Sequence, residues 1–347
     1  MKLTMNATLA ALLASTTVAS AGGISRTDQS VDLLFEDGNV AQIGFGYVMP
    51  NVSDDATNSE MAPDYLSMSG GVKMDYGSYS AAILFDQPFG ALVDYPIGSP
   101  YPTMSADLRV NNLTALVSYD VNENIVVYGG LAAQMTSADA NIIPAPGAID
   151  VSSSTGFGYV VGAAYQIPEY ALRVSLTYRS AITSTHATTY EGSTVPDTEF
   201  TTPQSINLEA QTGINQKTLV FGSLRWVNYD AITITASSGP FAAELVDYTN
   251  DVFQYELGVG RKFTDTLSGA LTVAYEASDG APVSPLSPTD GRTSLGAALI
   301  YTMGATEVTG GVRYVWLGDG ISTPASGSQP FSNNTALAVG VSIKHTF

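Results

Sequence analysis

Apolar and polar residues alternate along most of the chain in segments the length of long β-strands. Leu172, Val174 and Leu176 fall on one face of the clearest segment, whereas Arg173 and Ser175 fall on the other. A period of two residues indicates an extended strand with one apolar and one polar face. The same alternation recurs to the end of the chain, without a single thick hydrophobic core sequence. The pattern therefore predicts an all-β protein.

Fourteen such segments can be counted, separated alternately by short polar turns and by longer loops rich in Pro, Gly, Ser and Asp. Bacterial single-chain outer-membrane barrels have an even number of antiparallel strands. The count predicts a transmembrane antiparallel β-barrel of about fourteen strands over residues 39–347, with the short turns and both chain ends on the periplasmic side. Residues 188–201 are expected to form one of the longer loops. The expected strands are 40–52, 65–75, 81–96, 105–119, 124–138, 153–166, 170–186, 203–213, 218–235, 252–263, 267–277, 292–303, 307–317 and 331–347.

The third segment contains a proline in its middle. Pro88 has no N–H to donate to a neighbouring strand, and Gly90 permits backbone conformations that other residues resist. A proline inside a sheet belongs at an edge or a bulge. In a closed barrel, this strand is where the wall can open. The predicted side opening and substrate path comprise Asp86, Gln87, Pro88, Phe89, Gly90 and Leu92.

The first residues are typical of an exported protein. Lys2 precedes an apolar stretch that ends in Ala19-Ser20-Ala21, which predicts a signal peptide over 1–21 and a mature start at Gly22. Residues 22–38 show little alternation and are expected to fold back into the barrel as a short plug; a disordered tail is the alternative. The apolar residues that need burial in this segment are Val31, Leu33, Leu34 and Phe35.

Composition narrows the class of protein. Charged residues make up 13% of the chain, and the mean hydropathy is +0.12, as expected where apolar residues are spread over many membrane-spanning strands. The net charge of −19 opposes nucleic-acid binding, and the absence of cysteine excludes disulfides and thiol chemistry. Acidic clusters in the predicted loops either bind divalent cations shared with lipopolysaccharide or simply keep the loops solvated.

Several stretches, taken in order, resemble the FadL/TodX family of outer-membrane transporters for hydrophobic compounds. The alternating last strand that ends in Phe347 also resembles the signal read by the barrel-assembly machinery of the bacterial outer membrane. The family-like stretches are Gln29-Ser30-Val31, Gln87-Pro88-Phe89-Gly90, Thr202-Pro203-Gln204-Ser205-Ile206, Leu224-Arg225-Trp226, Leu257-Gly258-Val259-Gly260-Arg261, Ser284-Pro285-Leu286-Ser287-Pro288-Thr289-Asp290-Gly291-Arg292 and Tyr314-Val315-Trp316-Leu317-Gly318-Asp319.

The resemblance implies a fourteen-stranded barrel with an N-terminal hatch and a kink in the third strand that opens the wall sideways. It implies passive uptake of long-chain fatty acids, aromatic hydrocarbons or similar hydrophobic compounds, with lateral exit into the outer membrane. The family's hatch usually carries an Asn-Pro-Ala motif, whereas here Phe35-Glu36-Asp37-Gly38-Asn39 leads straight into the first strand. A short plug leaves a general diffusion porin for small polar solutes as the alternative function.

The strand phase points six charged side chains into the barrel. One reading is a solvated wall of paired charges; the other is that one arginine binds a fatty-acid carboxylate with its guanidinium fork. His186 and His345 have no evident catalytic partner, so no enzyme activity, cofactor or metal is expected; an adhesion or structural barrel remains a further option. The inward charges are Arg173, Arg179, Arg225, Arg313, Glu256 and Glu276.

Overall fold

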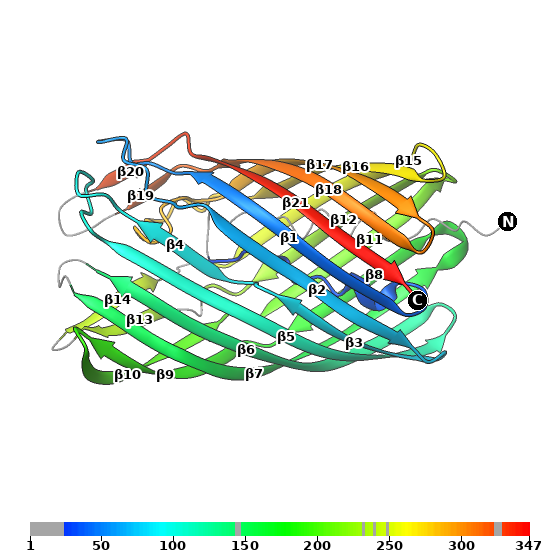
Figure 1. Cartoon of the computed structure of the whole chain (residues 1–347), viewed down its shortest axis with the longest axis horizontal. Coiled ribbons are helices and arrows are strands. Elements are labelled where there is room, and N and C mark those ends of the chain that lie inside the picture. The colour runs from blue at the N-terminus through cyan, green and yellow to red at the C-terminus, as the bar shows by residue number, and fades with distance from the viewer. Residues whose placement is uncertain (1–23, 143–146, 231–232, 239–240, 248–249, 323–327) are drawn as a thin grey trace.

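A computed structural model describes residues 24–142, 147–230, 233–238, 241–247, 250–322 and 328–347. Their strands form one closed antiparallel barrel, whose strands all tilt across the axis (Figure 1). The longer loops lie at one end of the barrel, and the short turns lie at the other. The predicted signal peptide falls outside the described residues.

The main sheet contains β1 (Val40–Asn51), β2 (Tyr65–Asp75), β3 (Tyr79–Asp86), β4 (Gly90–Asp94), β5 (Ser105–Asn122), β6 (Ile125–Asn141), β7 (Ala148–Ile167), β8 (Leu172–Arg179), β9 (Ile182–Tyr190), β10 (Ser193–Thr202), β11 (Ser205–Asn215), β12 (Thr218–Val227), β15 (Val252–Lys262), β16 (Leu267–Glu276), β17 (Arg292–Met303), β18 (Thr306–Leu317) and β21 (Thr335–Thr346). Smaller elements are the 3-10 helices η1 (Asp32–Phe35) and η2 (Pro168–Tyr170) and the pairs β13 (Thr233–Ser238) with β14 (Phe241–Asp247) and β19 (Gly320–Ser322) with β20 (Gln329–Phe331).

Three crossings of the barrel wall are each made by two strands in succession. β3 and β4 both pair with β5, and β8 and β9 both pair with β7. β10 pairs with β9 and β11 pairs with β8, so β10 and β11 together form the next crossing. Counted this way, the described strands cross the wall fourteen times, which confirms the predicted number. β1 pairs with β21 from Val40↔Thr346 to Asn51↔Thr335, and this ladder closes the barrel.

The prediction of a loop over residues 188–201 is wrong. β9 continues to Tyr190, the chain turns at Glu191 and Gly192, both with positive φ, and β10 begins at Ser193. This hairpin is rich in threonine, a β-branched residue that favours strands, but it lacks the apolar outward face seen elsewhere. Its polar sequence therefore predicts a loop, although its two strands extend the barrel wall.

The two faces of the barrel differ in polarity, as the alternation predicts. Leu66, Leu131 and Phe157 point outward and expose 70%, 70% and 76% of their surface. An apolar outer wall of this kind is typical of a barrel that faces lipid. Among the described residues, no helix has both the length and the apolar character required to cross a membrane. Polar side chains buried on the inner face include Thr114, Gln134, Arg173, Thr202 and Arg225.

The N-terminal segment, residues 24–38, runs inside the barrel and includes η1 (dark blue in Figure 1). Val31, Leu33 and Leu34 are buried against Leu84 and Leu116 of the inner wall. The apolar cluster noted in the sequence is thus packed against the barrel, and the segment fills part of the lumen near the short turns.

Loops also fold over the opposite end of the lumen. The Tyr95 hydroxyl donates to the carbonyl of Pro285 at 2.7 Å, and the Tyr101 hydroxyl bonds to Ser322. Both tyrosines are almost fully buried. Burial raises the pKa of both hydroxyls, so they stay protonated at neutral pH. The loops after β4, β16 and β18 therefore form one packed cover at the long-loop end.

Candidate functional site

The third wall crossing is interrupted at the predicted place. Asp86 of β3 pairs with Asn112 of β5, and Gly90 of β4 pairs with Arg109, so the interrupted strand uses one more residue than β5 over the same rise. This extra residue is a bulge that contains Pro88, which has no N–H to donate to a ladder.

The interruption separates β4 from β2. β2 pairs with β3 as far as Gly70↔Phe85, and among the strand pairs of the described residues β4 has β5 as its sole partner. The upper part of β2, from Tyr65 to Ser69, is paired with β1 on one side and not with β4 on the other. The barrel wall therefore lacks one hydrogen-bonded ladder between the start of β2 and β4.

The backbone groups at this gap are bonded by other parts of the chain. The Gln87 side chain accepts from the backbone N–H of Met68 at 2.9 Å and donates to Asn111 at 3.0 Å. The N–H of Arg26 donates to the carbonyl of Pro88 at 2.7 Å, and the N–H of Gly90 donates to the carbonyl of Ile24 at 2.8 Å. The N-terminal segment thus pairs with the edge that the interruption exposes, which satisfies the need to bond backbone groups at membrane depth.

Apolar cavities lie on the lumen side of this gap. One small cavity of about 60 Å³ is lined by Ile24, Leu108, Phe200 and Leu286 together with small side chains such as Ala91. Its exposed lining is almost entirely apolar. Pockets for apolar ligands typically have such a lining.

A second small pocket of about 70 Å³ adjoins the apolar cavity, since Ile24, Ala91 and Leu286 line both. This second pocket also touches Tyr65 of β2 and Leu92 of β4, the two strands that flank the gap. A groove among the loops at the long-loop end shares Leu92 with the second pocket and shares Ala106 with the apolar cavity. The three spaces therefore follow one another from the loops, through the lumen, to the gap in the wall.

The other predicted residues of this region lie around the same spaces. Phe89 is buried beside Ile24 in the apolar cluster. Asp86 accepts from the hydroxyl of Thr27 and from the amide of Asn112, both at 3.0 Å. Asp86 therefore anchors the N-terminal segment just below the interruption.

Three of the predicted lumen arginines bond to the N-terminal segment. Arg173 forms an ion pair with Asp32, and its guanidinium lies 4.4 Å from the ring centre of Phe35. Arg179 donates to the carbonyl of Gln29 at 2.8 Å. Arg225 donates to the carbonyl of Thr27 and to the Gln29 side chain, both at 2.9 Å. These side chains hold the segment in place, so in this conformation none is open to a ligand carboxylate.

The remaining predicted charges pair with each other or with neighbours on the wall. Arg313 and Glu256 are 2.7 Å apart, and Glu276 lies 3.3 Å from Arg292. These pairs fit the reading of the lumen wall as a set of compensated charges.

Sequence reasoning missed several groups that contact the segment. Lys344 of β21 bonds to Glu36 at 2.8 Å and to Glu307 at 3.0 Å. The hydroxyls of Ser25 and Tyr229 are 2.5 Å apart. These partners are separated by long stretches of chain, and alternation alone gives no signal for such a contact.

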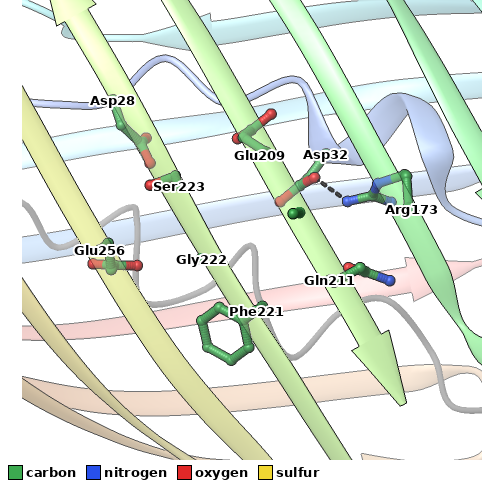
Figure 2. Close-up of a pocket in the computed structure, with 10 residues that line it drawn as sticks. Asp28, Asp32, Arg173, Glu209, Gln211, Phe221, Gly222, Ser223 and Glu256 are labelled. Atoms are coloured by element: carbon green, nitrogen blue, oxygen red, sulfur yellow. Dashed lines mark hydrogen bonds and ion pairs between the residues drawn. The ribbon is translucent and has the colours of Figure 1, made fainter. Parts of the chain in front are cut away.

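A polar pocket lies beneath the segment. Figure 2 shows Asp28, Glu209 and Glu256 around this pocket, with the Asp32–Arg173 pair at its side. Glu209 accepts from the hydroxyl of Ser30, a residue of the segment, at 2.9 Å. Burial, with the nearby Glu256 carboxylate, raises the pKa of Asp28 to about 6. Within the described residues, no group of three or more His, Cys, Asp or Glu side chains is arranged to hold a metal ion.

Solved structures resemble this barrel over almost its whole length. A FadL homologue from Pseudomonas aeruginosa matches with a TM-score of 0.74 at 14% identity, covering 96% of this chain and 98% of that one. The toluene transporter TodX from Pseudomonas putida gives 0.67 at 12% identity, covering 96% and 100%. The toluene transporter TbuX from Ralstonia pickettii gives 0.65 at 13% identity, covering 96% and 99%.

The similarity lies in the structure rather than in the sequence. No protein-family model matches the chain, and neither does any curated protein sequence. At identities this low, the structural matches establish the architecture: this chain has the fold of the FadL and TodX barrels.

Proposed function

We propose that this protein is an outer-membrane transporter of the FadL/TodX type, which takes up hydrophobic compounds and releases them sideways into the membrane. The single observation that carries the proposal is that an apolar lumen cavity and the pocket beside it lie next to a wall gap between β2 and β4. The printed names of the structural neighbours, which include toluene transporters, support a hydrophobic cargo.

In this proposal, cargo collects in the groove among the loops, enters the apolar cavity and leaves past Pro88, Phe89, Gly90 and Leu92. Passage is passive, because it exchanges one apolar environment for another and requires no covalent step. Long-chain fatty acids, aromatic hydrocarbons and similar lipids all fit this chemistry. The N-terminal segment acts as the plug: its buried apolar residues and its bonds to the lumen arginines oppose free passage of water and ions.

The test is to restore a backbone donor at the gap. In a Pro88→Val variant, the added backbone N–H can donate a hydrogen bond at the gap, and uptake of a radiolabelled hydrophobic compound by intact cells is expected to fall by about tenfold. The control is Pro203→Val, because Pro203 also interrupts a wall crossing, between β10 and β11, and lines neither of the two pockets at the gap. Equal uptake by the two variants would remove the side exit from the proposal.

Conductance separates this function from that of a general porin. A barrel filled by the N-terminal segment is expected to pass little ionic current in planar bilayers. A large, steady aqueous conductance of the full-length protein would favour diffusion of small polar solutes instead.

A further inference from the structure

Arg26 lies across the gap in the wall. Its guanidinium carbon is 4.1 Å from the ring centre of Tyr65, at the start of β2. On the other side, a Cβ built on Gly90 of β4 would lie 2.7 Å from both Cζ and Nε of Arg26. A single side chain therefore touches both strands that lack a ladder between them, and Gly90 leaves the space in which that side chain lies.

The bonding of Arg26 differs from that of the other lumen arginines. Arg173, Arg179 and Arg225 each donate from their terminal nitrogens to the N-terminal segment. The buried Nε of Arg26 is without a partner among the described residues, as are those of Arg179 and Arg225. The terminal nitrogens make the difference, because those of Arg26 donate no hydrogen bond to a described residue, whereas those of Arg179 and Arg225 do. A buried donor without an acceptor carries a free-energy cost that an incoming acceptor can remove.

The position of Arg26 connects this free donor to the proposed path. Arg26 lines the second pocket together with Ile24, Ala91 and Leu286, the residues shared with the apolar cavity. A molecule that leaves the cavity for the gap meets the Arg26 side chain before it reaches lipid. The Tyr65 ring contacts the Arg26 side chain directly, and the Asp107 carboxylate attracts it without a salt bridge between the two. Such interactions are weaker than a salt bridge to a buried carboxylate.

Building on the proposed function, we infer that Arg26 is a specificity-determining latch of the side exit. It closes the gap by lying on Tyr65, and it leaves the ring when an anionic oxygen group on the cargo accepts its free N–H donors. A guanidinium suits such a group because its planar fork bonds two oxygens at once. The latch therefore favours an amphiphile with a carboxylate head over a neutral molecule with the same chain.

The test compares two cargoes of equal chain length, a saturated fatty acid and the corresponding fatty alcohol, in cells that express the full-length protein. Arg26→Met keeps the length of the side chain and removes its charge, so the acid-to-alcohol uptake ratio is expected to fall about tenfold. Arg26→Lys keeps the charge and is expected to retain most of the ratio. The matched control is Arg261→Met, because Arg261 is exposed on β15, away from the gap, and donates to the Thr218 hydroxyl; its ratio is expected to stay unchanged.

An unchanged ratio in Arg26→Met overturns the inference, and so does an equal fall in uptake of both cargoes, which would assign Arg26 to anchoring the segment. If Arg26→Met does not fold, Tyr65→Leu weakens the latch while leaving the charge; uptake of both cargoes is then expected to rise about threefold, and no rise overturns the inference. Wild-type protein that takes up neither these two cargoes nor an aromatic hydrocarbon overturns the proposed function itself, whereas a normal wild-type rate with an insensitive ratio overturns the latch alone.

Discussion

The two halves of the lumen are built differently. Toward the short turns, the N-terminal segment is fixed by ion pairs and hydrogen bonds from Arg173, Lys344 and Arg225. Toward the loops, the lumen holds apolar cavities bounded by side chains such as Phe200 and Leu286. Directional polar contacts hold a segment in one position, whereas an apolar cavity accepts molecules of varied shape. In the proposed function, closure and passage therefore belong to separate halves, which meet at the gap beside β4.

The largest effect is expected from a variant that releases the N-terminal segment from the half of the lumen near the short turns. Arg173→Met leaves the buried Asp32 carboxylate without its partner, which costs about 3–5 kcal/mol for a buried ion pair. The segment is expected to leave its site, and planar-bilayer recordings are expected to show a steady ionic current that the wild type lacks. The double variant Arg173→Met/Asp32→Leu is the control: it removes both charges and is expected to conduct less than the single variant.

A smaller effect is expected from filling the apolar cavities in the half of the lumen near the loops. Ala91→Phe places a ring in the space shared by the two apolar pockets, so affinity for a hydrophobic ligand is expected to fall about tenfold, as measured by equilibrium binding in detergent. Ala133→Phe adds the same ring to the lipid-facing side of β6 and is expected to leave binding unchanged. Equal losses in both variants would show that the cavity is not the binding site.

The docking of the N-terminal segment in the lumen is expected to depend on pH. Because the pKa of Asp28 is raised to about 6 from its ordinary 3.8, the docked segment binds the proton more tightly than the undocked one. This contribution to docking is complete below about pH 4 and is lost as the pH rises through about 6. Ionic leak is therefore expected to be lower at pH 5 than at pH 7.5, and Asp28→Asn is expected to reduce this difference. A leak that rises on acidification would contradict the assignment.

The smallest effect is expected outside both halves. Lys262 and Asp265 form an ion pair at an exposed turn, 3.2 Å apart. Exposed pairs contribute little to stability. Asp265→Asn is therefore expected to leave thermal stability, ion leak and ligand binding unchanged within error, and a measurable change in any of them would show that the turn is coupled to the lumen.

The sequence predicts the fold well because alternation is a local property of each strand. The number of wall crossings and the interruption at Pro88 both follow from residues close together in the chain. Alternation does not predict the hairpin of β9 and β10, since these threonine-rich strands lack an apolar face. Local patterns carry no information about partners far apart, so the phase placed Arg173 and Arg225 inside the barrel without indicating that they hold the N-terminal segment. Arg26 gave no signal at all, because it precedes the first strand.

The contact between Glu36 and Lys344 has a consequence for the order of assembly. Glu36 lies just before β1, whereas Lys344 lies in β21, the last strand to leave the ribosome, so 308 positions separate the two partners. A contact of such long sequence separation forms late, since the whole loop between its ends must first be ordered. The Glu36–Lys344 contact therefore belongs to the same step as the β1–β21 ladder. The end of the segment that precedes β1 is thus fixed to the wall only when the first and last strands meet.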